Sequence, residues 1–220
     1  MKNTQYDTVI WDLDGTLLDT AEDLRDAVNH VEKQYGYPQH DLATIKRFLG
    51  YGIEQLMVSA TPQGKENPQF AEIFAAFKQY YTANCNKKTD LFAGIREVVT
   101  ELHQRGIRQA IVSNKNKQAV EELAAIYFQK EIDCAVGQQD NMAKKPAPDM
   151  VHYALQCLQK DGSTAVYIGD SEVDVLTAKN SGLPCIAVSW GFRSRLELEQ
   201  AGAEAIVENT EELLKQLLDS

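Results

Sequence analysis

The sequence predicts an α/β protein whose central sheet is parallel and which carries a helical insertion after its first strand. Two observations predict the sheet: short β-branched and apolar runs recur along the chain, and segments with helical spacing of apolar residues separate them. Each run is apolar on both faces, as expected for strands covered by helices on both sides. A third observation predicts the insertion, because about eighty residues after the first run contain helical patterns and no further run.

The candidate strands are, in chain order, residues 6–12, 109–113, 132–136, 165–169 and 184–188. Helices are expected between the later strands, around residues 95–102, 120–127 and 151–158, with a final helix at about 210–218. Parallel strands are joined by right-handed crossovers, so this alternation indicates an open, Rossmann-like sheet.

The insertion sets the expected domain organisation. Its four helical patterns are separated by loops, among them the turn at Pro38 and the segment 61–68. We therefore expect an α/β core made of residues 1–17 and 92–220, and an inserted α-helical cap made of residues 18–91. A cap with two connections to the core can swing as a lid.

Composition excludes several classes of partner. The 220 residues include 32 acidic and 22 basic side chains, and the net charge of −10 argues against nucleic acid or an anionic membrane. No apolar run approaches the roughly 20 residues of a membrane-spanning helix, and the first residues contain no apolar segment typical of a signal peptide. The four cysteines are too widely spaced for a metal knuckle or a redox pair. We expect a cytoplasmic protein; the sequence does not indicate its oligomeric state.

Two carboxylates follow the first predicted strand. Alternate residues of a strand point the same way, so Asp12 and Asp14 should project together, about 6.6 Å apart. They lie at the carboxyl end of the sheet, where open α/β folds bind their ligands. Two such close carboxylates repel each other, which indicates a divalent cation or a shared proton. Taken alone, the pair is equally consistent with solvated acids at a strand end.

The ends of the other predicted strands add complementary groups. Ser113 and Asn114 offer a hydroxyl and an amide after the second strand, and Asp170 and Asp174 offer two carboxylates after the fourth. Between these strands lies Lys145, which two nearby prolines hold just ahead of a helix. A mostly acidic site with one positioned ammonium is what a metal ion and a phosphoryl group require.

Four motifs in this order resemble those of the haloacid dehalogenase-like superfamily of aspartate-nucleophile phosphatases. They are DLDGT at 12–16, Ser113 in SNK, Lys145 in KPAP, and Asp170 with Asp174 in GDSEVD. Within the superfamily, the segments DTAEDLRDAVNH, FLGYGIEQLM, KKPAPD and VSWGFR are similar to phosphoglycolate phosphatases. Pyrophosphatases and sugar-phosphate phosphatases with the same kind of cap share them.

The resemblance implies a Mg²⁺-dependent phosphatase that hydrolyses a small phosphorylated metabolite, such as phosphoglycolate, through an aspartyl-phosphate. The catalytic residues that it implies are Asp12 as the nucleophile, Asp14 as the acid and base, Ser113 and Lys145. The substrate-binding residues would be Ser113, Asn114, Lys145 and Thr16. The ligands of Mg²⁺ would be Asp12, Asp170 and the main-chain carbonyl of Asp14, supported by Asp174 and Ser171.

Related reactions remain alternatives. A β-phosphoglucomutase-type phosphomutase would keep both Asp12 and Asp14, but that family has an arginine three residues after the cap glycine. Counted from Gly50, that position is the uncharged Ile53. Dehalogenases of the superfamily lack an acid and base at the position of Asp14, so its presence argues against that reaction. A binding module that kept only the fold would be expected to lose a motif residue, and none is missing here.

The sequence does not identify the leaving group of the substrate, because the core motifs contact only the phosphate. Lys46 and Arg47 precede the glycine turn of the insertion and are its candidate cations for reading an anionic leaving group. A solvated helix face would explain both side chains equally well.

Overall fold

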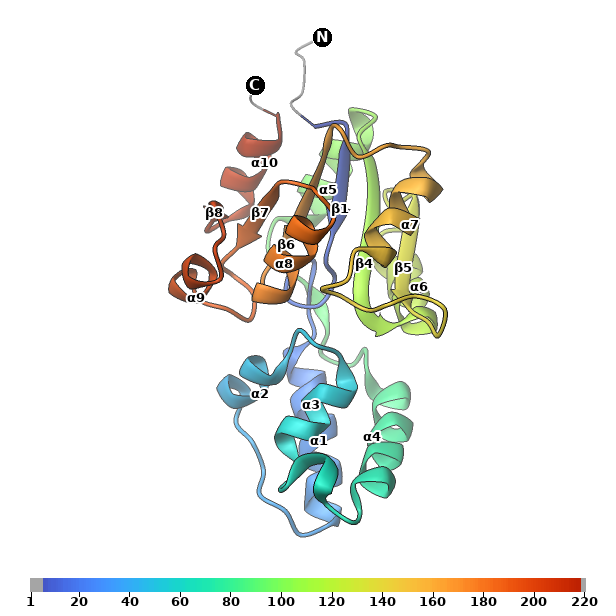
Figure 1. Cartoon of the computed structure of the whole chain (residues 1–220), viewed down its shortest axis with the longest axis vertical. Helices are drawn as coiled ribbons and strands as arrows, with labels where there is room; N and C mark the ends of the chain where they lie inside the picture. Colours follow the sequence, from blue (N-terminus) through green and yellow to red (C-terminus); the bar gives the residue numbers. More distant parts are fainter. Residues whose placement is uncertain (1–5, 219–220) are drawn as a thin grey trace. The chain divides into compact units, whose positions relative to one another are not determined.

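The computed structural model describes residues 6–218, which divide into two compact units. Residues 18–90 form one unit, and the remaining described residues form the other. The larger unit is built on a six-stranded sheet with the order β5-β4-β1-β6-β7-β8, and all of its strand pairs are parallel (Figure 1). Its strands are β1 (Thr8–Trp11), β4 (Arg108–Asn116), β5 (Cys134–Gln138), β6 (Ala165–Gly169), β7 (Cys185–Val188) and β8 (Ala205–Val207). The predicted α/β class with a parallel sheet is confirmed.

Strand β1 lies at the centre of the sheet, and all four of its residues are buried. Its last residue, Trp11, is in register with Ile111 of β4 and Ile168 of β6. The end of β1 therefore lies beside the end of β6 and beside the middle of β4, which continues to Asn116 along the same direction. Residues that follow them in sequence are brought to the same edge of the sheet.

Helices cover both faces of this sheet (Figure 1). They are α5 (Ile95–Gln104), α6 (Lys117–Tyr127), α7 (Asp149–Leu158), α8 (Glu172–Asn180), α9 (Arg195–Gln200) and α10 (Thr210–Leu218). Helix α7 packs on β4 and β5, and α8 packs on β6 and β7. Apolar side chains of these elements form one continuous core, which includes Ile10, Val112 and Ala154.

The helical insertion is confirmed as well. It contains α1 (Ala21–Gln34), α2 (Leu42–Phe48), α3 (Ile53–Ala60), the short 3₁₀ helix η1 (Gly64–Glu66) and α4 (Phe70–Asn84). Helix α1 packs on α2 and α4, and α2 packs on α3. The fully buried side chains of Val28, Leu56 and Phe77 come from three of these helices. The unit therefore has an apolar core of its own.

Three short strands were not predicted. Strands β2 (Leu18–Asp19) and β3 (Asp90–Leu91) pair with each other in the segment expected to contain none, so that expectation was wrong. The edge strand β8 also escaped prediction. Strands of two or three residues are too short for an alternating pattern to show. Among residues 6–218, no helix combines the length and the hydropathy needed to cross a membrane.

Candidate active site

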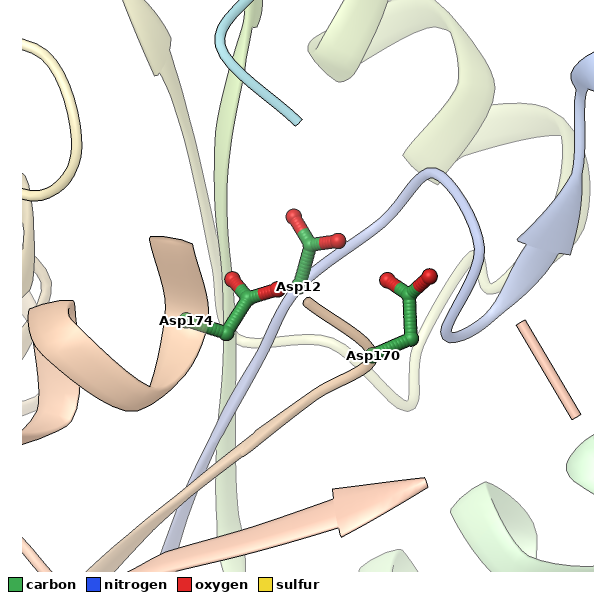
Figure 2. Close-up of side chains that lie close together, drawn as sticks. All are labelled: Asp12, Asp170 and Asp174. Atoms are coloured by element: carbon green, nitrogen blue, oxygen red, sulfur yellow. The ribbon is translucent and has the colours of Figure 1, made fainter. Parts of the chain in front are cut away.

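Three buried carboxylates gather at the carboxyl ends of β1 and β6. Asp12 follows β1, Asp170 follows β6, and Asp174 lies in the first turn of α8. One oxygen of each lies within 4.8 Å of the others, and Figure 2 shows the three side chains converging. Their exposed fractions are 6%, 1% and 1%. Such a cluster is costly to bury unless positive charge accompanies it.

Lys145 supplies part of that charge. Its ammonium lies 2.6 Å from Asp12 Oδ1 and 2.8 Å from Asp174 Oδ1. It also donates to the hydroxyl of Tyr167, at 3.0 Å. Burial alone would lower the pKa of Lys145, but the charges of Asp12 and Asp174 hold that pKa well above its usual value. Lys145 is therefore a permanent cation whose three N–H donors face three oxygens.

Asp174 is committed to hydrogen bonds on both oxygens. Its Oδ1 accepts from Lys145 and from the hydroxyl of Tyr167, at 2.8 and 3.1 Å. Its Oδ2 accepts from the main-chain N–H of Ser171 at 3.1 Å and from the Ser171 hydroxyl at 2.6 Å, which caps α8. A carboxylate oxygen has two lone pairs, so these four bonds occupy Asp174. That leaves Asp12 and Asp170 as the better candidate metal ligands.

Asp12 and Asp170 both hold their protons more tightly than ordinary carboxyl groups. Burial raises the pKa of Asp12 to about 7, despite the opposing charge of Lys145. Burial and the neighbouring carboxylates of Asp174 and Asp12 hold the pKa of Asp170 well above its usual value. A divalent cation would favour the ionised forms, and hard cations such as Mg²⁺ prefer carboxylate oxygens. The donor set therefore fits the expected cofactor.

Asp170 is oriented by contacts from two loops. Its Oδ1 accepts from the hydroxyl of Thr16, and its Oδ2 accepts from the main-chain N–H of Phe192, at 3.2 and 2.6 Å. Gly15 has a φ of +95° and lies against this carboxylate, as does Gly191, so a Cβ at either position would collide with Asp170. The expected contact of Thr16 with substrate stays a prediction.

The loop that contains Phe192 was not identified as part of the site. Trp190 Nε1 in this loop donates to the carbonyl of Thr16, at 3.1 Å. Arg193 is buried and forms a two-pronged ion pair with Glu172, at 2.8 and 3.0 Å. The segment VSWGFR carries part of the family resemblance, but it contacts Asp170 through the main-chain N–H of Phe192. Nearly every residue type has such an N–H, so the sequence does not indicate the contact.

Ser113 and Asn114 lie near the end of β4, and both are buried. The side-chain oxygen of Asn114 accepts from the main-chain N–H of Lys145 at 2.8 Å, and its NH₂ donates to the Lys145 carbonyl at 3.2 Å. Asn114 thus holds the Lys145 backbone in place. The Ser113 hydroxyl accepts from the N–H of Lys115 at 3.2 Å. The predicted contacts of Ser113 and Asn114 with substrate are not tested by these bonds.

Asp14 is not one of the three clustered carboxylates, and it is paired with Lys115. The distance from Lys115 Nζ to Asp14 Oδ1 is 2.8 Å, and the two side chains are 3% and 20% exposed. Neither Lys115 nor Tyr167 was predicted as a site residue. Lys115 has no periodic signal, and Tyr167 lies in a strand whose pattern is simply apolar.

In the other unit, Lys46 and Arg47 lie in the last turn of α2. The guanidinium of Arg47 donates to the hydroxyl of Thr44 on the same helix, at 3.1 Å. The expectation that one of these cations reads the leaving group stays a prediction.

Comparisons with known proteins agree with the motifs. The family model described as haloacid dehalogenase-like hydrolase matches residues 9–188. A phosphoglycolate phosphatase of Cupriavidus necator is 30% identical over 93% of this chain and 90% of its own length. One from Rhodobacter capsulatus is 32% identical over 84% of this chain and 85% of its own. A crystal structure from Lactobacillus delbrueckii subsp. bulgaricus, provisionally assigned as a phosphoglycolate phosphatase, has a TM-score of 0.93 and 35% identity, with complete coverage of both chains. The chain belongs to the haloacid dehalogenase-like hydrolases and is similar to phosphoglycolate phosphatases.

Proposed function

We propose that this protein hydrolyses a small phosphate monoester, phosphoglycolate, with Asp12 as the nucleophile. The buried Asp12–Lys145 ion pair carries the proposal, because it combines an oriented carboxylate with a fixed cation at the end of a central strand. Phosphoryl transfer requires little more than positioned groups and neutralised oxygens. The similarity to phosphoglycolate phosphatases supports the choice of substrate.

The reaction would proceed in two displacements at phosphorus. An Asp12 carboxylate oxygen forms a bond to phosphorus, and the ester oxygen leaves with its bonding electrons and takes a proton from Asp14. Water then attacks the phosphorus of the aspartyl-phosphate and gives a proton to Asp14. This second displacement releases inorganic phosphate and restores Asp12.

The surrounding residues would neutralise the phosphoryl oxygens and keep the reacting groups in position. Lys145 neutralises the transferring oxygens and keeps Asp12 aligned, and Ser113 binds a phosphoryl oxygen. Asp12, Asp170 and the main-chain carbonyl of Asp14 would hold Mg²⁺, which would supply positive charge between the nucleophile and the phosphate. Asp174 orients Lys145, and Ser171 holds Asp174 in place. Residues 18–91 would act as the cap over the leaving group.

The test is phosphate release from a panel that contains phosphoglycolate, pyrophosphate and β-glucose 1-phosphate, with Mg²⁺ or with excess chelator. The proposal predicts Mg²⁺-dependent hydrolysis with the highest kcat/KM for phosphoglycolate. A higher kcat/KM for pyrophosphate or for the sugar phosphate would contradict phosphoglycolate as the substrate but would be consistent with the proposed mechanism. Conversion of β-glucose 1-phosphate to its 6-phosphate without phosphate release would support the phosphomutase alternative.

A further inference from the structure

A second buried ammonium stands beside the proposed acid and base. Lys115 is the next-to-last residue of β4 and is 4% exposed. Its Nζ lies 2.8 Å from Asp14 Oδ1. Lysine is seldom buried to this extent, because removing its charge from water is costly unless a partner compensates. Asp14 is the partially exposed partner of that pair.

The backbone on both sides of Lys115 is fixed. Its own N–H donates to the Ser113 hydroxyl, and the side chain of Asn116 accepts from the N–H of Ala119 to begin α6. The register between β4 and β5 shifts between Val112 and Asn116. Gly137 of β5 packs so closely on the following turn that a Cβ there would collide with the backbone of Asn116 and Lys117. The ammonium is therefore placed by the fold rather than by a flexible surface segment.

The two buried lysines stand at different places in the proposed reaction. Lys145 faces Asp12 and Asp174, on the side of the nucleophile. Lys115 faces Asp14, which in that reaction must reach the ester oxygen that departs. A cation bonded to Asp14 is thus close to the first atoms of the leaving group. An ammonium carries three N–H donors, so a bond to Asp14 is compatible with a second bond to a substrate oxygen.

We propose that Lys115 determines specificity by binding a carboxylate on the carbon next to the ester oxygen, as in phosphoglycolate. This inference rests on the proposed function, since it assumes that Asp14 protonates the leaving oxygen. In phosphoglycolate one carbon separates that oxygen from the carboxylate, which matches the short reach from Asp14 to Lys115. The core itself then reads the charge of the leaving group, independently of Lys46 and Arg47.

The experiment compares phosphoglycolate with 2-hydroxyethyl phosphate, which replaces the carboxylate by a neutral CH₂OH group. Loss of Lys115 also disturbs Asp14, but that disturbance affects both alkyl esters alike, so the informative quantity is the ratio of their kcat/KM values. Lys115→Met should lower the ratio of phosphoglycolate to 2-hydroxyethyl phosphate by about tenfold or more, mainly through the KM of phosphoglycolate. Lys115→Arg should restore part of the ratio.

Lys117→Met is the matched control, because this lysine lies two residues further on, is 54% exposed and pairs only loosely with Glu121, at 3.8 Å. Its ratio should equal that of the wild type. Lys115→Gln, which keeps a polar group against Asp14, is measured beside Lys115→Met in case the latter folds poorly. Equal losses for both esters in the Lys115 variants would overturn the inference and leave the proposed function standing. Wild-type protein that hydrolyses neither ester would contradict the proposed function, and the inference with it.

Discussion

The Lys145 ammonium lies 2.6 Å from Asp12 Oδ1, and the two residues are 133 positions apart in the chain. Both side chains are buried, so neither charge is screened by water as a surface pair would be. Breaking such a pair by removing one partner is strongly destabilising, because the other charge is left uncompensated. The proposed nucleophile and its counter-ion are therefore a single structural unit. We expect substitutions around this pair to change stability and activity measurably.

Tyr167→Phe tests the support of Lys145. The hydroxyl of this fully buried tyrosine accepts from Lys145 and donates to Asp174, so its loss leaves two charged groups each short of one bond. We expect the free energy of unfolding to fall by about 1–3 kcal/mol, and kcat to fall as well. Urea unfolding measures the first effect. Tyr153→Phe, at an exposed position, is the control, and an equal effect of both substitutions would refute a special role for Tyr167.

Gly191→Ala tests the placement of Asp170. A Cβ at this position would collide with the Gly15 carbonyl and with the Asp170 side chain, and so displace a candidate metal ligand. Changes to the groups that orient a metal ligand typically lower metal affinity by about 10–100-fold. We therefore expect the Mg²⁺ concentration for half-maximal activity to rise by about that factor. Titration of activity with Mg²⁺ measures it. Gly182→Ala is the control for lost stability without displacement of Asp170, because its φ of +70° strains an alanine but nothing lies within 4 Å of the added Cβ. An unchanged Mg²⁺ requirement in Gly191→Ala would argue against Asp170 as a ligand.

Asp14→Asn separates proton transfer from structure. An amide cannot protonate the leaving alkoxide, so formation of the aspartyl-phosphate should slow by about 10²–10⁴-fold with an alkyl phosphate. With p-nitrophenyl phosphate, whose leaving group needs little protonation, the same step should slow much less. Rapid-quench measurement of the first turnover compares them. Equal losses for the two esters would instead indicate that Asp14 acts through structure or metal binding.

We expect Glu32 to make the stability of the helical unit depend on pH. Its side chain is fully buried, Oε1 accepts from the Thr61 hydroxyl at 2.7 Å, and burial raises its pKa against the opposing effects of Thr61 and His40. The folded state then holds this proton more tightly than the unfolded state, so stability falls as pH rises above the unfolded pKa. Relative to Glu32→Gln, the wild type should lose unfolding free energy as pH rises from about 4 towards neutrality. Chemical unfolding at several pH values measures the difference, which a flat profile would contradict.

The fold was largely predictable because its strands carry strong local signals. Strand β6 runs from Ala165 to Gly169, as its apolar pattern indicates. In contrast, β4 continues to Asn116, three residues beyond its predicted end at position 113, because polar residues there belong to the strand. The length of that extension depends on pairing with β5, which no local pattern encodes.

The candidate site was predictable where its residues follow strands. Because parallel strand ends share one edge, Asp12 and Asp170 meet although they are 158 positions apart in the chain. Their roles stay predictions. Tyr167 was not predictable, since its hydroxyl meets Lys145 only through the packing of β6 against the segment before α7. The Phe192 N–H was not predictable either, because any residue except proline offers one.

In the proposed reaction Asp12 carries the phosphoryl group during turnover, and chemical trapping can locate that group. Protein quenched in acid during turnover of phosphoglycolate would be reduced with borohydride, which converts an aspartyl-phosphate to homoserine, and mapped by peptide mass spectrometry. We expect homoserine at position 12, none in protein without substrate, and none at the buried Asp174. Turnover without any modification at position 12, or with homoserine at another aspartate, would contradict it.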